Sequence, residues 1–478
     1  MMCSRKHWIG LIAVVAAVAP SAVGRAADDR PPNILLILAD DLGAKELSCY
    51  GHPRHRTPRL DELARTGVRF ETCYATPLCH PTRFELLTGQ YGCHNGVYNF
   101  AGKRGGPDPD SPVEDIGANH LTFAELLKTR GYATALAGKW QLSGKVPTLI
   151  HDSGFDEYLM WAYRHNLPPG TVYQGGFEGN KEKLARYWHP SLVRNGQYVP
   201  TQPNDFGPDL FTDFLIDFMR RKKSEPFCAY YSMCQTHGPW FTTPDTTKSE
   251  SDRAVNSKAN FQANVEYVDK LVGRMIDALD ELGLRENTIV IFTGDNGTGG
   301  EGKGDATELG ARVPLIVNCP GRVKAVGTSD ELVDLSDVFP SLAEWGGAQL
   351  PDDRPIDGRS FVSLVEGRAG PRREWIFSYL GDRRILRDKR WLLEDNSPHQ
   401  LGRLYDCGER RDGRDYRDVT GSQEPEAVAA RARFDALLAN LPAPIIAEAG
   451  SPKAKKPERA QARAERARAK AAAAKSPE

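Results

Sequence analysis

One unit in the second half of this 478-residue chain constrains its fold more than any other feature. Apolar residues recur every three or four positions from 261 to 282, which predicts a helix with one buried face, and Gly283 ends that helix. Apolar runs typical of buried strands precede it at 227–233 and follow it at 288–293. Strands and helices in alternation predict a sheet with right-handed crossover connections. We therefore expect an α/β protein.

Helices are expected on both faces of this sheet. The first strand, at 33–39, is a continuous apolar run of the kind that is buried on both faces. Helical patterns at 60–66 and 121–129 lead into strand-like segments at 68–70 and 132–137. The expected fold is a large, mixed, mostly parallel sheet sandwiched by helices.

The pattern changes near residue 371. Short apolar runs separated by charged turns predict a smaller C-terminal subdomain with an antiparallel sheet, covered by a helix at about 424–440. The predicted parts are a signal peptide at 1–26, an α/β domain at 27–370, a small α+β subdomain at 371–445 and a basic low-complexity tail at 446–478. The tail has no apolar stripe to bury and is expected to be disordered. It either solubilises the chain or attracts it to an anionic surface or polysaccharide.

The N-terminus has the three regions of a secretory signal peptide. Arg5 and Lys6 precede an apolar run at 8–23, and small residues follow at 24–26. A retained membrane anchor is the alternative, but the uninterrupted apolar stretch is short for a span. We expect an exported protein, periplasmic or secreted, with no stable membrane insertion. The balance of 62 Lys and Arg against 63 Asp and Glu argues against a nucleic-acid partner.

The cysteine pattern does not predict a zinc site. Eight cysteines remain once Cys3 leaves with the signal peptide, and none forms a metal-like C-x-x-C pair. An exported protein can form disulfides, but their connectivity cannot be read from the spacing.

Acidic residues follow two of the predicted strands. Asp40 and Asp41 come directly after the first strand, and Asp295 and Asn296 follow the strand at 288–293. Ligands of open α/β sheets bind at the carboxyl ends of the strands. Three carboxylates and an amide form an all-oxygen set that suits Ca²⁺ or Mg²⁺ rather than zinc. For either pair alone, a turn or a helix cap is the alternative.

A second group of residues surrounds Cys79. Pro81 suits a first helical turn and Gly89 suits a C-cap, so Cys79 is predicted at a helix N-terminus. The helix dipole there would favour a thiolate or a substrate oxyanion. Arg83 would project from the same face one turn later. A small buried cysteine is the alternative.

These residues resemble a family signature. C-x-P-x-R followed by L-x-T-G is similar to the signature of the type I sulfatases, which belong to the alkaline phosphatase superfamily. The resemblance spans roughly residues 31–345 and weakens toward 407. Further matching pieces occur in the family's order: the strand and acids at 32–41, G-K-W-Q-L at 138–142, T-H-G-P at 236–239, G-D-N-G at 294–297 and G-K-G at 302–304.

The resemblance implies a particular chemistry at Cys79. A formylglycine-generating maturation enzyme would oxidise this residue to Cα-formylglycine, whose hydrate is a geminal diol. One hydroxyl would attack the sulfur of a sulfate ester, and the other would collapse to the aldehyde and expel sulfate. The implied partner is a sulfated carbohydrate or another sulfate ester, and residues 27–370 become the catalytic domain.

The same resemblance assigns the remaining site residues. Ca²⁺ is the expected ion, ahead of Mg²⁺. The positive charge that a sulfate ester transition state needs would come from lysine and arginine side chains, and a histidine would protonate the leaving oxygen. The implied metal residues are Asp40, Asp41, Cys79, Asp295 and Asn296, and the implied catalytic residues are Cys79, Arg83, Lys139, Gln141, His237 and Lys303.

The sequence departs from the family pattern at two positions. Thr82 stands where serine is commoner, which keeps a hydroxyl. Gln141 stands where the family usually has a histidine, and a glutamine cannot take up a proton at neutral pH. Another base must serve, or none does; His151 and His165 are candidates that the sequence does not place.

Two other functions stay open. A phosphodiesterase or phosphonate monoester hydrolase of the same superfamily would share the metal and the nucleophile. A non-catalytic polysaccharide-binding protein would need neither. Aromatic and histidine residues of the long loop at 160–205 would either stack on sugar rings or pack the loop, namely Trp161, Tyr163, Tyr187, Trp188 and His189.

Overall fold

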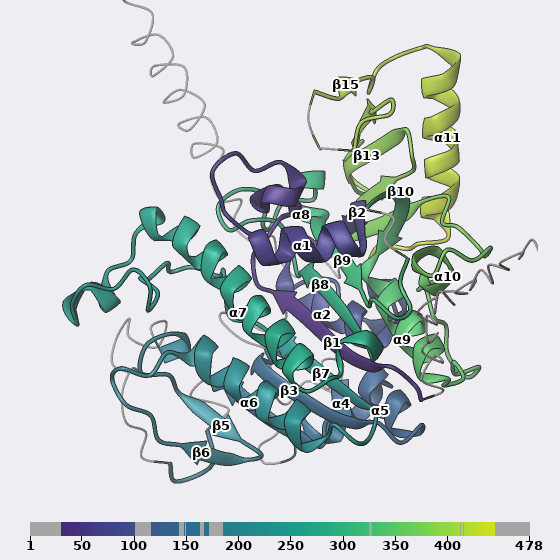
Figure 1. Ribbon diagram of the computed structural model, residues 1–478. Coiled ribbons are helices and arrows are strands. Elements are labelled where there is room, and N and C mark those ends of the chain that lie inside the picture. Colours follow the sequence, from purple (N-terminus) through teal and green to yellow (C-terminus); the bar gives the residue numbers. More distant parts are fainter. Residues whose placement is uncertain are drawn as a thin grey trace, which may run out of the picture.

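A ten-stranded sheet runs through the centre of the computed structural model (Figure 1). The structure describes residues 30–100, 116–142, 148, 150–162, 167–171, 185–324, 327–411, 413 and 415–444. The predicted signal peptide and basic tail, together with Tyr163 and His165, lie outside these residues. In the described part, no helix is long and apolar enough to cross a membrane.

The strand order is β10-β2-β9-β8-β1-β7-β3-β4-β5-β6. The five central strands from β8 to β4 are parallel to one another. Strand β9 runs antiparallel to β8 and β2, and β5 and β6 form an antiparallel extension beside β4. The strands are β1 (Asn33–Ala39), β2 (Val68–Tyr74), β3 (Ala133–Lys139), β4 (Glu157–Trp161), β5 (Leu192–Arg194), β6 (Gln197–Val199), β7 (Phe227–Ser232), β8 (Thr288–Gly294), β9 (Arg312–Asn318) and β10 (Gly327–Asp334). The predicted mixed, mostly parallel sheet is confirmed.

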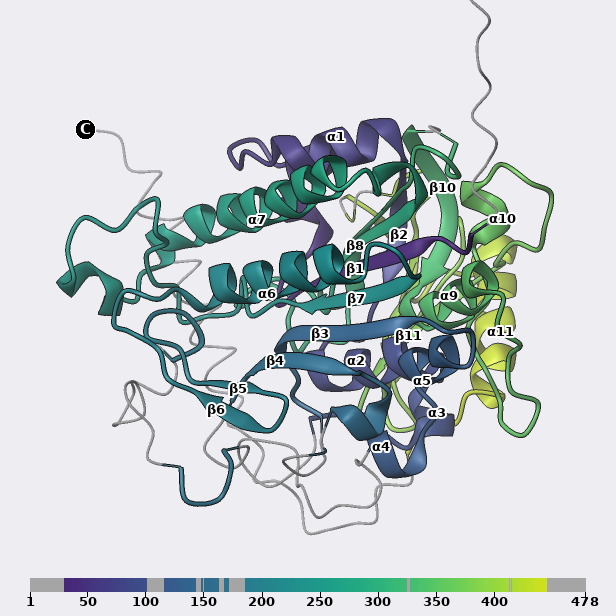
Figure 2. The same cartoon turned by 60° about the horizontal axis from the view of Figure 1, so that its bottom comes forward.

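Helices cover both faces of the sheet, as predicted (Figure 2). Because side chains alternate along a strand, Ile34, Leu36 and Leu38 of β1 enter one core and Leu35 and Ile37 enter the other. The longer helices α1 (Pro58–Thr66), α6 (Gly207–Arg221) and α7 (Phe261–Glu281) pack on the second core, and α2 (Cys79–Thr88), α5 (Phe123–Lys128) and α9 (Val338–Gly346) pack on the first. The shorter helices are α3 (Gly92–Asn95), α4 (Ile116–Asn119), α8 (Glu308–Ala311) and α10 (Val362–Val365).

The strand–helix–strand unit is present with one refinement. Gly283 follows α7 with φ +69°, a left-handed conformation that glycine adopts at little cost. Strands β7 and β8 are not neighbours, because β1 lies between them and is parallel to both. The first strand of the chain therefore occupies the centre of the sheet.

The C-terminal part forms a second, five-stranded antiparallel sheet. It contains β11 (Ile376–Leu380), β12 (Arg383–Arg387), β13 (Trp391–Asn396), β14 (Arg403–Asp406) and β15 (Arg417–Asp418) in sequence order. Helix α11 (Pro425–Ala439) covers it through Phe434 and Leu438, which pack with Phe377 and Leu393. This sheet and its covering helix match the sequence prediction.

Candidate active site at the carboxyl ends of the strands

The acidic residues after β1 and β8 meet, as their positions predicted. Ala39 and Gly294 are paired in register, so the residues that follow them leave the sheet at the same edge. The backbone N–H of Asp41 donates to Asp295 Oδ1 at 2.9 Å. The amide of Asn296 donates to Asp41 Oδ1 at 3.0 Å.

Three cations neutralise these carboxylates. Lys139, at the end of β3, has its Nζ 2.7 Å from Asp40 Oδ2. Arg83, from α2, has Nη2 2.7 Å from Asp295 Oδ2. Lys303 Nζ lies 2.6 Å from Asp41 Oδ1. The predicted cations and carboxylates therefore form one compact cluster, which is buried except for Lys303, whose side chain is 19 % exposed.

The buried charges shift one another's pKa values. Burial alone would raise the pKa of Asp40, but Lys139 above all, with His237, Arg83 and Lys303, holds it well below its usual range. Burial and the neighbouring charge of Asp40 raise the pKa of Asp295 to about 7. An ion bound between these carboxylates would remove the repulsion that raises it.

Cys79 joins this cluster from the first position of α2. Leu78 is the N-cap, and Gly89 ends the helix with φ +68°. Ligand atoms of Cys79, Asp40 and Asp295 all lie within 4.8 Å of one another. The prediction that the helix N-terminus stabilises a thiolate at Cys79 is wrong. Burial raises the pKa of the thiol, and this effect is larger than the opposing effect of the charges of Lys139 and Lys303. An unmodified Cys79 is therefore a protonated thiol at neutral pH.

The hydroxyl of Thr82, where the family prefers serine, has a structural role. Thr82 Oγ1 accepts from the backbone N–H of Thr76 at 3.0 Å and bonds the Thr76 hydroxyl at 2.7 Å. It thereby attaches the first turn of α2 to the segment that follows β2. Threonine supplies this contact as serine would.

His237 lies at the mouth of the cluster. Its side chain is 26 % exposed, and Nε2 lies 3.8 Å from Asp41 Oδ2. Nδ1 donates to the carbonyl of Gly238, which leaves Nε2 to face the cluster. Burial lowers the His237 pKa to about 4, against the opposing effect of Asp41 and Asp40. The ring is therefore neutral at pH 7.

Gln141 lies two residues beyond β3 in a left-handed conformation, with φ +56°. Its carbonyl accepts a hydrogen bond of 2.9 Å from Nδ1 of His80, the residue next to Cys79. Its Oε1 is buried without a partner among the described residues. His151 donates from Nδ1 to the carbonyl of Phe155 at 2.8 Å, a contact with the segment before β4 rather than with Cys79.

The loop aromatics pack the protein. Trp161, Tyr187 and Trp188 are each at most 4 % exposed, so of the two alternatives these three pack the protein rather than stack on sugar rings. His189 Nε2 lies within hydrogen-bonding distance of the carbonyl of Thr201, at 3.1 Å. Tyr187 instead donates from its hydroxyl to the carbonyls of Cys234 and His237, which holds the His237 segment.

Sequence reasoning missed further residues around the site. Ser232, at the end of β7, accepts from Arg83 Nη1 and donates to the Lys139 carbonyl. The charge of Arg186 helps to lower the His237 pKa. Trp240 lies near the cluster, because Asp41 and Trp240 both border Gly299. A side-chain Cβ at Gly299 would be 3.1 Å from Asp41 Oδ2 and 3.7 Å from Trp240 Cζ2. A polar or aromatic residue at a strand end or in a loop has no distinctive spacing that would reveal these contacts.

The donor set fits a hard divalent cation. Asp40, Asp41 and Asp295 supply carboxylate oxygens within one buried cluster. Asn296 Oδ1 is buried and has no hydrogen-bond partner in the described part of the chain. A buried amide oxygen without a donor costs free energy that a metal–oxygen contact would recover.

A mostly parallel sheet with carboxylates, cations and a buried cysteine at its strand ends is an arrangement that suits a hydrolase of anionic esters. The sulfatase family model matches residues 32–348, and the chain belongs to this family and is a sulfuric ester hydrolase. It is 34 % identical to human arylsulfatase A over 382 residues, which covers 73 % of this chain and 71 % of that protein. It is 33 % identical to mouse steryl-sulfatase over 460 residues, with coverage of 77 % and 70 %.

Solved structures share the fold. BT4656, solved in complex with its substrate D-glucosamine-2-N,6-O-disulfate, matches with a TM-score of 0.66 and 22 % identity, over 86 % of this chain and 97 % of that one. A phosphonate monoester hydrolase from Silicibacter pomeroyi matches with a TM-score of 0.60 and 20 % identity, over 86 % and 95 %. At these identities the likeness concerns the fold.

Proposed function

We propose that the protein is an exported sulfatase that removes sulfate from a sulfated carbohydrate, with a formylglycine made from Cys79 and a bound Ca²⁺. The observation that carries the proposal is the position of Cys79. Its sulfur lies in a buried cluster with Asp40 and Asp295, beside the charges of Lys139 and Arg83. Positive charge around a buried reactive position suits an anionic ester.

Modification of Cys79 to formylglycine would account for repeated turnover chemically. A formylglycine hydrate supplies one hydroxyl as the nucleophile and a second whose loss of a proton regenerates the aldehyde as sulfate leaves. The protonated thiol that burial favours offers no such route. The side chain enters the cluster from the first position of α2, where unpaired backbone N–H groups favour negative charge.

Asp40, Asp41, Asp295 and Asn296 would hold the ion. A bound Ca²⁺ supplies positive charge beside Cys79 and offsets the repulsion between the carboxylates. Ca²⁺ is preferred over Mg²⁺ because a cluster of several carboxylate oxygens and an amide oxygen suits its larger, more flexible coordination shell.

The remaining polar residues would bind the ester and its leaving group. Arg83, Lys139 and Lys303 bear positive charge where the sulfate oxygens accumulate negative charge. His237 directs Nε2 toward the same place and donates a proton to the leaving oxygen. Its low pKa in the ligand-free protein requires that the anionic ester raise the proton affinity of the ring.

A ring-shaped leaving group fits the side of the site next to His237. Trp240 lies three residues beyond it, and the Trp240 Nε1–H donates to the Thr236 carbonyl at 2.9 Å, which orients the indole. A sugar ring can stack on such a surface. The structural likeness to a protein solved with a sulfated glucosamine supports a carbohydrate substrate.

Mass spectrometry of the peptide that contains Cys79 tests the proposal directly. The expected result, after co-expression with a formylglycine-generating enzyme, is an aldehyde at this position, together with turnover of 4-nitrophenyl sulfate. A thiol in fully active enzyme would overturn the formylglycine mechanism. Faster hydrolysis of phosphate diesters than of the sulfate would favour the phosphodiesterase alternative. A thiol and no turnover of any ester would favour a binding protein.

A further inference from the structure

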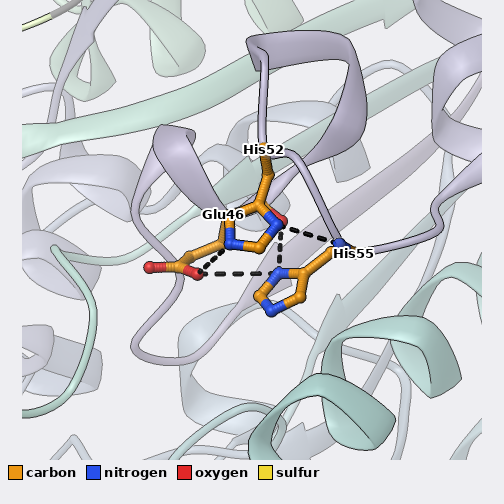
Figure 3. A group of neighbouring side chains, drawn as sticks. All are labelled: Glu46, His52 and His55. Carbon is orange, nitrogen blue, oxygen red and sulfur yellow. Dashed lines mark hydrogen bonds and ion pairs between the residues drawn. The ribbon is translucent and has the colours of Figure 1, made fainter.

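A buried carboxylate beyond the proposed metal residues has no part in the chemistry above. Glu46 lies in the short 3-10 helix Ala44–Glu46, which follows β1, and only 4 % of it is exposed. His52 and His55 stack with ring centroids 3.5 Å apart, and both face its Oε2 atom (Figure 3). Ligand-type atoms of the three residues lie within 4.8 Å of one another.

The hydrogen bonds argue against a metal ion at this cluster. His52 Nδ1 accepts from the backbone N–H of His55 at 2.9 Å, so the hydrogen of the neutral ring is on Nε2, which faces Glu46. His55 Nδ1 lies 2.8 Å from the Glu46 carbonyl oxygen and must donate, because a carbonyl only accepts. Both nitrogens that face the carboxylate therefore carry hydrogens. A histidine nitrogen that binds a metal ion needs a free lone pair, which His52 Nε2 and His55 Nδ1 do not have in these tautomers.

The other carboxylate oxygen contacts the loop that carries Lys303. Thr298, which is 4 % exposed, donates from its hydroxyl to Glu46 Oε1 at 2.8 Å. The same hydroxyl accepts from the backbone N–H of Gly43 at 3.4 Å. Thr298 thereby joins the segment after β1 to the segment after β8. These two segments carry Asp40 and Asp41 on one side and Asp295 and Asn296 on the other.

Thr298 also determines the path of the loop back to the site. Its carbonyl accepts from the backbone N–H of Glu301 at 2.9 Å and of Lys303 at 3.3 Å. From this turn the Lys303 side chain reaches Asp41 Oδ1 at 2.6 Å. The position of the ammonium group therefore depends on how firmly Thr298 is held.

We propose that Glu46 and Thr298 form a positioning contact for Lys303. The proposal rests on the catalytic role proposed above for that lysine. Lys45 Nζ lies 3.3 Å from Glu46 Oε1 and balances the charge of the carboxylate, and His52 Nε2 lies 3.9 Å from Oε2. The carboxylate holds the Thr298 hydroxyl, and the Thr298 carbonyl holds the turn that presents Lys303. Because Lys303 would act on charge that develops in the transition state, loosening this contact should lower kcat more than it raises KM.

A double-mutant cycle tests the contact in the calcium-loaded, formylglycine-containing enzyme, with 4-nitrophenyl sulfate as the probe. Thr298→Val removes the hydroxyl at nearly constant size, and Thr298→Ser keeps it. We expect Thr298→Val to lower kcat by about tenfold with KM changed by less than about twofold, which is within the range of coupling between neighbouring residues. Thr298→Ser should retain at least about half of the wild-type kcat.

The decisive measurement is the same substitution in a Lys303→Ala background. If Thr298 acts through the lysine, Thr298→Val should cost less than about twofold there, since the group that it positions is absent. Glu46→Gln should show the same non-additive pattern, because a neutral amide oxygen accepts the Thr298 hydroxyl more weakly than a carboxylate does. Glu46→Gln replaces Thr298→Val in this comparison if Thr298→Val does not fold.

Thr212→Val is the matched control. Thr212 is a buried threonine in α6 whose hydroxyl donates to the carbonyl of Pro208 at 2.9 Å, away from the site. It should lower the melting temperature as Thr298→Val does and leave kcat unchanged. Equal losses from Thr298→Val in both backgrounds, or wild-type kcat in Thr298→Val, would overturn the positioning role while the proposed function stands. Wild-type kcat in Lys303→Ala would instead overturn the role of the lysine and the contact that depends on it.

Discussion

Cys79 shows how strongly the surroundings of one residue determine its chemistry. Its sequence position suggests an activated thiolate, but burial raises the thiol pKa and favours the neutral form. We expect Cys79→Ser to accumulate a sulfated protein and to stop after one turnover, because a serine ester has no second hydroxyl that can collapse to an aldehyde. Intact-protein mass spectrometry after incubation with substrate measures the adduct. Cys79→Ala should show neither adduct nor turnover, and repeated turnover by the serine variant would contradict the mechanism.

Gln141 should contribute through its side-chain oxygen. That atom is buried without a partner among the described residues, so it can accept a hydrogen bond from substrate or from the modified Cys79. We expect Gln141→Ala to raise the activation barrier by about 1–3 kcal/mol because a donor loses its acceptor, and Gln141→His to change the turnover rate little. Stopped-flow kinetics supply the check. A large burst followed by slow turnover in the wild type would mean that the family's base has no replacement here.

The site residues differ in how far the sequence predicts them. Asp40 and Asp295 follow apolar strands directly, so the geometry of a parallel sheet is enough to bring them together. Lys139 and Lys303 are ordinary lysines without the family motifs around them. Ser232 and Glu46 contact their partners from segments far apart in the sequence, and local patterns carry no record of such contacts.

At the scale of elements, α7 stabilises the start of α1. The N-cap residue of α1, Thr57, makes no side-chain capping bond. Asp269 of α7 takes its place and accepts from the backbone N–H groups of Arg59 and Leu60, at 3.2 and 2.8 Å. Burial raises the pKa of Asp269 to about 6, and its backbone donors oppose this shift.

This raised pKa predicts a pH dependence of stability with a definite sign. Above pH 6 the carboxyl is ionised in both states, and the folded state bears the desolvation cost. Below pH 6 the folded state takes up a proton that the unfolded state, in which this carboxyl has its ordinary pKa of 3.8, does not yet bind, so this contribution to stability grows as the pH falls. Two pH units correspond to roughly 3 kcal/mol. Urea unfolding at pH 8 and pH 4 gives the free energy of unfolding of wild type and of Asp269→Asn. The value for wild type minus the value for the variant should be larger at pH 4 than at pH 8. A smaller value at pH 4 would contradict the raised pKa of Asp269.

Element prediction succeeded where periodicity was clean and failed where it was interrupted. Helix α7 and strands β1, β7 and β8 follow strong apolar patterns. Strand β9 contains Pro314, which lacks a backbone donor and usually argues against a central strand, so the sequence gives no strand signal here. A register shift in its pairing with β2, between Phe70 and Cys73, accompanies it. Strand β12 is rich in arginine, and the buried Arg387 is paired with Glu308 at 3.0 Å and donates to the carbonyl of Arg410 at 2.9 Å.

For the molecule as a whole, metal removal should reduce stability without unfolding the protein. The carboxylates at the site are each paired with Lys139, Arg83 or Lys303, so the cluster keeps a near balance of charge without an ion. An ion bound only to the folded state at 100 times its Kd adds about 2.7 kcal/mol. We expect chelation to abolish activity and lower the melting temperature, with recovery on adding Ca²⁺. Asn296→Ala should reduce this shift, and full activity in metal-free protein would contradict the site.

The two sheets share a hydrophobic core, so we expect that the predicted boundary at 371 does not separate two units that fold independently. Tyr74 and Leu332 of the large sheet pack with Ile376 and Ile385 of the small one. Ser378 donates to the carbonyl of Ala75 at 2.7 Å, close to the turn that leads into Cys79.

A chain that ends at residue 370 should therefore fail to form a stable, active enzyme, whereas one that ends at 444 should match the full chain. The shorter chain lacks Arg387, which leaves the buried Glu308 carboxylate without its cation at 3.0 Å, and it exposes the apolar face that Ile376 and Ile385 cover. Removing one partner of a buried pair alone costs about 3–5 kcal/mol, a large part of the stability of most domains. Circular dichroism, thermal unfolding and sulfate release compare the two chains. Cooperative unfolding and sulfate release by the chain of 370 residues would show that the small sheet is dispensable and that the shared core contributes little.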